Sequence, residues 1–264
     1  MNRELVSLAK QVNYVCPDRF VSGQIVEYDI RQANINILYK YGEIDQEKYE
    51  FLKNIPKYNR EVIVGNMIKE DKKIYNTIQK GIKESKVKLF ESNDIREHEV
   101  IRIANDAVYV NRINELKYTS FDGIDFVKKS ISTCFLKLNN ILFFINCKND
   151  NINVDVKGLG ENYQIHQPMI SIIVNIITEL YFMGVKPAMN SLNGFIEDYI
   201  NYKLGAEYYR ELTPEAKYRV IGGQFFLSEM EYIRPEIDIN YNLYILRELS
   251  SVLYEIYTNN YRNL

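Results

Sequence analysis

Hydrophobic positions in the first half of the chain form strand-like runs that lead to two single aspartates. The first run, Gln24 to Ile30, alternates apolar and polar residues and contains Asp29. The second is split into Glu99 to Ile103 and Ala107 to Val110, with an Asn-Asp pair between the halves. Asn and Asp tolerate turn conformations, so this arrangement predicts a hairpin. We expect its tip to present Asp106 as an exposed, rigidly held side chain.

Helical spacing of apolar residues fills the segments between and after these runs. It predicts helices at residues 3–12, 31–41, 45–54 and 58–83, and again at 169–183, 191–204 and 241–257. Asp45 and Ser191 have the residue types of helix N-caps, and Gly42 is suited to end the helix before it. Three further strands are predicted at residues 131–138, 141–147 and 152–156.

These elements predict an α+β fold with an antiparallel-rich sheet that has helices on one face. The strands end near Gly160, and helices dominate after Pro168. We therefore expect two domains, residues 1–165 and residues 166–264. The first would contain the sheet and a small helical insertion at residues 43–90, and the second would be mostly helical.

The composition indicates a globular protein and excludes few functions. Hydrophobic residues make up 46% of the 264, and the formal net charge is −2. This balance disfavours nucleic-acid binding without excluding it, because affinity depends on the local charge that faces phosphate. No stretch approaches about 18 uncharged apolar residues, so we expect no membrane span and a cytoplasmic location. Three widely spaced cysteines, without Cys-x-x-Cys pairs, predict reduced thiols and no zinc site.

The two aspartates are the main candidates for chemistry. They are 106 − 29 = 77 residues apart, which leaves room for a helical crossover that places both strands in one sheet. Paired carboxylates on neighbouring strands are the hard oxygen ligands that divalent cations prefer. An aspartate at a strand end is common in α/β proteins, so spacing alone does not identify a metal site.

Four segments resemble motifs of template-dependent DNA polymerases. Asp29-Ile-Arg-Gln-Ala-Asn-Ile-Asn-Ile-Leu38 resembles motif A, in which a strand ends at a metal-binding aspartate and continues into a helix. Ile103-Ala-Asn-Asp-Ala-Val-Tyr-Val110 resembles motif C, the hairpin with the second catalytic aspartate. Val127-Lys-Lys-Ser-Ile131 and Asp155-Val-Lys-Gly-Leu159 resemble the Lys-Lys and Lys-Gly segments of family B polymerases. The order of the segments also matches, over roughly residues 20 to 170.

The resemblance implies a reduced palm and thumb core, of viral or plasmid origin, with residues 43–90 as small fingers. Asp29 and Asp106 would be catalytic and would bind Mg²⁺ or Mn²⁺. Lys57 and Arg60, one helical turn apart, would meet a nucleoside triphosphate. The nucleic-acid contacts would come from Lys128, Lys129 and Lys157. The expected partners are a primer–template and nucleotides, with other replication proteins, in the cytoplasm of a host cell.

Several residues depart from the family pattern and leave alternatives open. Ala104 stands where family B motif C usually has its first acid, and Arg31 to Ala33 contain no steric-gate aromatic. A palm-derived nucleic-acid-binding or replisome subunit without catalysis is therefore one alternative. An α+β protein with no nucleic-acid role is another. Glu27, two residues before Asp29, is either a third carboxylate of the site or a solvated strand residue.

Overall fold

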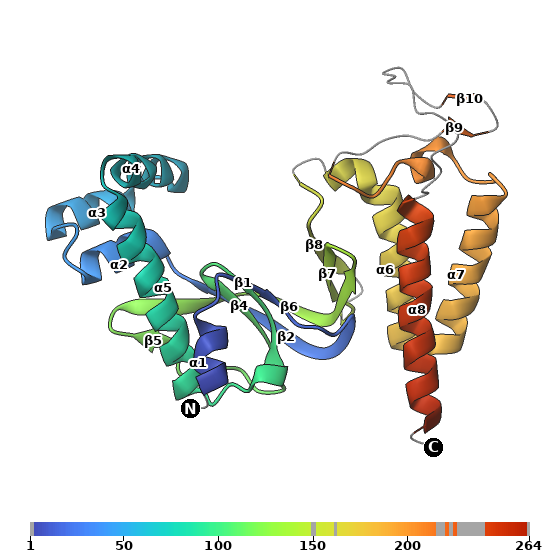
Figure 1. Ribbon diagram of the computed structural model, residues 1–264, viewed down its shortest axis with the longest axis horizontal. Coiled ribbons are helices and arrows are strands. Elements are labelled where there is room, and N and C mark those ends of the chain that lie inside the picture. Colours follow the sequence, from blue (N-terminus) through green and yellow to red (C-terminus); the bar gives the residue numbers. More distant parts are fainter. Residues whose placement is uncertain are drawn as a thin grey trace. The chain divides into compact units, whose positions relative to one another are not determined.

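The computed structural model describes residues 3–148, 152–160, 163–214, 220–221, 224–225 and 241–262 (Figure 1). The chain forms two compact units, each described here by itself. Unit 1 comprises Met1–Pro17 and Ser22–Ser132, and unit 2 comprises Asp18–Val21 and Thr133–Leu264. Both contain helices and antiparallel strands, so the predicted α+β class is confirmed. The division between the units precedes the boundary that we predicted at residue 165.

Unit 1 contains a sheet in the order β1-β3-β4-β2-β6, with β5 paired to the start of β6. Strands β3 and β4 form the predicted hairpin, and β2 pairs antiparallel with β4. Both β2 and β6 continue from unit 1 into unit 2. The strands are β1 (Asn13–Val15), β2 (Phe20–Ile30), β3 (Val100–Ala104), β4 (Ala107–Asn111), β5 (Ser120–Phe121) and β6 (Ile124–Leu138).

Unit 1 contains five helices in its described part, and one prediction about them is wrong. The expected helix over residues 58–83 is two helices, because Asp71 is extended at φ −136° and interrupts the run. Its side chain accepts a hydrogen bond from the backbone N–H of Lys73 at 2.8 Å and so begins a new helix. The helices are α1 (Arg3–Ala9), α2 (Ala33–Lys40), α3 (Gln46–Asn54), α4 (Lys57–Glu70) and α5 (Lys72–Ser92), followed by the 3-10 turn Glu97–Glu99.

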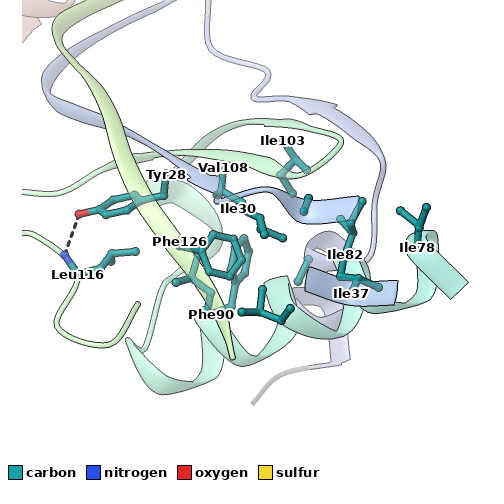
Figure 2. Packing of buried hydrophobic residues seen from close by; sticks show 14 of the residues in the cluster. Tyr28, Ile30, Ile37, Ile78, Ile82, Phe90, Ile103, Val108, Leu116 and Phe126 are labelled. Carbon is teal, nitrogen blue, oxygen red and sulfur yellow. Dashed lines mark hydrogen bonds between the residues drawn. The ribbon is translucent and has the colours of Figure 1, made fainter. Parts of the chain in front are cut away.

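The core of unit 1 lies between one face of the sheet and helices α2 and α5. Figure 2 shows apolar side chains from the helices beside those of the strands, including Ile37, Ile82, Phe90, Ile30, Val108 and Phe126. Tyr28 on β2 points into this core, where its hydroxyl accepts a hydrogen bond from the Leu116 N–H at 3.0 Å. Side chains alternate along a strand, so Glu27 and Asp29 lie on the opposite face of the sheet.

Unit 2 has its own core, formed by the end of β6, two more strands and three helices. Strand β7 pairs antiparallel with both β6 and β8. The elements are β7 (Ile141–Asn146), β8 (Asn153–Lys157), α6 (Gln167–Met183), α7 (Val185–Ile200) and α8 (Tyr241–Arg262), with 3-10 turns Tyr163–His166 and Ala206–Tyr209 and the short pair β9 (Val220–Ile221) and β10 (Gln224–Phe225).

Helix α7 begins six residues before the N-cap that we predicted. Gly184 adopts φ 92° and separates α6 from α7, so Ser191 lies inside the helix and caps nothing. Pro187 is tolerated because it falls in the first turn, where backbone N–H groups lack helical partners. The stretch Gln164–Met183 is long and apolar enough to cross a membrane by length and composition alone. Six of its residues are buried in the core of unit 2.

Candidate functional site

The sheet of unit 1 brings the two aspartates to a single pocket. Asp29 is the next-to-last residue of β2 and lies opposite Ala107 of β4 in the antiparallel register. Asp106 directly precedes Ala107 in the two-residue turn of the hairpin. Both side chains line a pocket of about 440 Å³. The arrangement of neighbouring strands expected from the sequence is therefore present in unit 1.

Three other elements of unit 1 complete the walls of this pocket. The chain from the end of β2 through the first turn of α2 forms one side, the start of α4 contributes basic residues, and β6 adds a lysine. The lining residues are Asp29, Ile30, Arg31, Gln32, Ala33, Asn34, Ile35, Lys57, Arg60, Glu61, Asn105, Asp106 and Lys129. Five of the seven residues singled out from the sequence thus lie around one cavity.

Asp106 is half-buried, which corrects the expectation of an exposed side chain at the hairpin tip. Burial raises the pKa of its carboxyl above the ordinary value, and the nearby charge of Asp29 raises that pKa further. The positive charges of Lys86 and Lys57 act in the opposite direction without cancelling the shift. Two carboxylates therefore repel each other in a partly desolvated place, which is an arrangement that a cation would stabilise.

The two adjacent lysines of β6 have different surroundings. The Nζ of Lys129 lies 3.7 Å from Asp29 Oδ2, inside the pocket. Lys128 points to the other face of the strand, as alternation requires, and pairs with Glu115. Lys157 belongs to unit 2, where its Nζ lies 2.8 Å from Asp155 Oδ2. Within unit 1, only Lys129 of the expected backbone-binding lysines lies at the aspartates.

The basic residues of α4 and the start of α2 make part of the pocket electropositive. Lys57 and Arg60 occupy the first turn of α4 and both line the cavity, although Lys57 also lies 3.5 Å from Glu61. Gln32 adopts the left-handed conformation (φ 47°) and turns the chain into α2. The backbone N–H groups at the start of a helix attract anions, so this wall suits a phosphate group.

Lys86, a fully buried lysine of α5 beside the hairpin, was not among the site residues predicted from the sequence. Its ammonium donates hydrogen bonds to the backbone carbonyls of Gln11 at 2.6 Å and Asn105 at 2.8 Å. Burial lowers its pKa to about 8 despite the favourable charge of Asp106. Its burial could have been predicted from the sequence, because Lys86 follows Ile78 and Ile82 at four-residue spacing on the apolar stripe of the helix.

Glu27 is not the solvated strand residue that was one of our alternatives. Its two carboxylate oxygens accept hydrogen bonds from the Tyr109 hydroxyl at 2.9 Å and the Ser130 hydroxyl at 2.7 Å. Its side chain is not among those that line the pocket. In the described ranges of the chain, no group of three or more His, Cys, Asp or Glu side chains could hold a metal ion. The aspartate pair would therefore need oxygen atoms of substrate and water.

Comparison with known proteins shows a phage family. The family model described as Bacteriophage PBS1 gene 130 protein matches residues 7–261, and the chain belongs to this family. No curated protein matches the chain. The expected viral origin is thereby supported, and the association with a phage implies a bacterial host cell. The family description names no activity, so the polymerase resemblance still depends on the residues themselves.

Proposed function

We propose that this member of a phage family is a metal-dependent nucleotidyltransferase that extends a nucleic-acid 3′-hydroxyl in the manner of a DNA polymerase. The supporting observation is that Asp29 and Asp106 share one pocket with Lys57, Arg60 and Lys129. A pocket lined by both acidic and basic residues suits a substrate that carries both a cation and a triphosphate. The volume of about 440 Å³ lies within the range of small-molecule sites.

The residues present fit a divalent cation. Carboxylate oxygens are the ligands that Mg²⁺ prefers, and Mg²⁺ commonly takes only one or two of them, with water and substrate phosphate as the other ligands. Asp29 and Asp106 would hold it, and its charge would offset both the burial and the repulsion by Asp29 that raise the pKa of Asp106. Once bound, such ions would supply a Lewis acid that activates the 3′-hydroxyl and neutralises the leaving pyrophosphate.

The other residues of the pocket would bind and orient the nucleotide. Lys57 and Arg60 would neutralise the negative charge of the triphosphate, and Arg60 can make paired hydrogen bonds to phosphate oxygens. The first turn of α2 would add backbone N–H donors on the same wall. Lys129, beside Asp29, would be the cation nearest the reacting strand, where it would pair with a backbone phosphate.

Primer extension by the full chain tests this function. Wild-type protein with Mg²⁺ or Mn²⁺ should lengthen a labelled primer on a template. Asp29→Asn and Asp106→Asn should each lower the rate by about 100-fold or more, since each removes a metal-binding charge. Asp94→Asn is the matched control, because Asp94 is an exposed aspartate with a positive φ that asparagine also tolerates. Equal rates for all four proteins would contradict the proposal.

A nucleic-acid-binding subunit without catalysis is the second candidate. The ion pair between Lys129 and Asp29 favours it, because an internal cation already occupies one carboxylate. Ala104 beside the hairpin tip adds no third acid. Fluorescence anisotropy with labelled primed DNA separates the two functions. Salt-dependent binding without any extension, and without loss of binding in Asp106→Asn, would favour the subunit.

A further inference from the structure

The ammonium group of Lys86 is buried and has lost its hydration. It is the only lysine that is fully buried in the described part of the chain, and it lies among apolar residues of α5 such as Ile82 and Phe90. Removing a charge from water is unfavourable unless hydrogen bonds replace the lost solvent. A lysine retained at such a position therefore calls for a reason beyond filling the volume.

The bonds of Lys86 all lead to the hairpin tip and the segment beside it. Its Nζ bridges the carbonyl oxygens of Gln11 and Asn105 at 2.6 Å and 2.8 Å. Asn105 is fixed from two more directions, since its N–H donates to the Val12 carbonyl at 2.7 Å and its side chain accepts from Gln79 at 3.5 Å. With φ 52°, Asn105 adopts the left-handed conformation that the two-residue turn requires and that asparagine tolerates. The residue so fixed directly precedes Asp106.

We propose that Lys86 is a positioning residue, which clamps the backbone of Asn105 so that the Asp106 carboxylate is held in the pocket ready for a divalent cation. The inference rests on the proposed function, because it concerns the metal site of that function. Lys86 is not among the residues that line the pocket. Its hydrogen bond to the Asn105 carbonyl is the contact through which it would position Asp106.

The sign of the effect on cation binding separates this role from simpler ones. A buried positive charge near Asp106 repels a metal ion, so removing it should tighten cation binding if Lys86 acts only through its charge. If Lys86 acts by positioning, removing it should weaken cation binding despite that electrostatic gain. A side chain that only fills space would leave cation affinity unchanged.

Titration of the full chain with Mn²⁺, followed by calorimetry or by the EPR signal of free Mn²⁺, measures this sign. Lys86→Met keeps nearly the length of the side chain and removes both hydrogen bonds to the backbone, and we expect about tenfold weaker Mn²⁺ binding. Lys86→Arg keeps a charged donor and should recover part of the affinity. Lys83→Met is the matched control on the same helix and should bind Mn²⁺ like the wild type. Circular dichroism establishes that each variant is folded, and Lys86→Leu, which also lacks a donor, replaces Lys86→Met if the latter is not.

The outcomes are distinct. Mn²⁺ affinity in the folded neutral variant equal to or higher than in the wild type would overturn the positioning role. Wild-type protein that binds Mn²⁺ but never extends a primer would refute the proposed function and leave the role of Lys86 to be decided by the variants. Wild-type protein that binds no Mn²⁺ would overturn both.

Discussion

We expect the ionised carboxylate of Asp106 to destabilise the folded protein. Its carboxyl is half-buried and faces the charge of Asp29, and its pKa is raised for those two reasons. As pH rises past the ordinary pKa of aspartate, the unfolded chain loses this proton first, so the free energy of unfolding falls. We therefore expect Asp106→Asn to raise the midpoint of thermal unfolding by a few degrees at pH 7 with EDTA present.

A comparison of Asp106→Asn with the wild type at acid pH is the control for this prediction. At a pH below the ordinary pKa of aspartate, both the folded and the unfolded wild type hold the proton, and the advantage of the asparagine should vanish. Differential scanning calorimetry at pH 7 and at acid pH tests this. A lower midpoint for the variant at pH 7 would show that the carboxylate is stabilising.

Lys86 should affect stability in alkali with the opposite sign. Its pKa falls from 10.5 in the unfolded chain to about 8 in the folded one. Between those pH values the unfolded chain binds more protons, so the free energy of unfolding should rise with pH, by at most about 1.4 kcal/mol per unit. Urea denaturation of the wild type and Lys86→Met at pH 8 and pH 10 isolates this contribution. An identical change of stability in both proteins would contradict it.

Helices α2 and α5 can approach each other closely because residue 81 of α5 is a glycine. A Cβ at Gly81 of α5 would lie 2.4 Å from Cγ2 of Ile37 on α2, closer than packed carbon atoms can approach. Gly81→Ala should therefore destabilise unit 1 by about 1–3 kcal/mol, although alanine favours the helix. Gly65→Ala in α4, where a Cβ would meet nothing within 4 Å, should stabilise by up to about 1 kcal/mol. Chemical denaturation measures both, and a stabilised Gly81→Ala would exclude the close contact.

Elements defined by local chemistry were predictable, and those set by competition between neighbours were not. The β3–β4 hairpin follows from Asn-Asp between two β-rich runs, and the N-cap of α3 follows from Asp45, which accepts from the Lys48 N–H. The break at Asp71 escaped prediction because helical periodicity continues across it and only the cap interrupts the backbone. The start of α7 at Val185 escaped because a proline can stand in a first turn.

The parts of the candidate site that depend on local strand and turn chemistry were also predictable. Alternation along β2 and the turn of the hairpin together place Asp29 and Asp106 on one pocket. The separation of Lys128 from Lys129 follows from strand alternation, which the polymerase resemblance had not taken into account. Lys86 lies beyond residue 83, where the predicted helix ended, so the prediction did not place it on the buried stripe of α5.

At the scale of the whole molecule, each unit has a separate hydrophobic core. Ile82 belongs to the core of unit 1 and Leu249 to that of unit 2. Truncation of a buried aliphatic side chain to alanine costs about 2–5 kcal/mol. We expect Ile82→Ala to lower amide hydrogen-exchange protection more in unit 1, and Leu249→Ala to lower it more in unit 2. Equal loss of protection everywhere after either change would indicate a single cooperative core.

Strand β6 restricts how the length of this chain can change. Its first residues belong to unit 1 and its last, from Thr133, to unit 2. Side chains alternate along a strand, so one inserted or deleted residue near Lys129 would exchange the two faces of everything that follows. The buried side chains of Leu136 and Leu138 would move to the opposite face of the strand, and the charged side chain of Lys137 would point into the core of unit 2. We therefore expect this chain to tolerate length changes in its loops better than in β6.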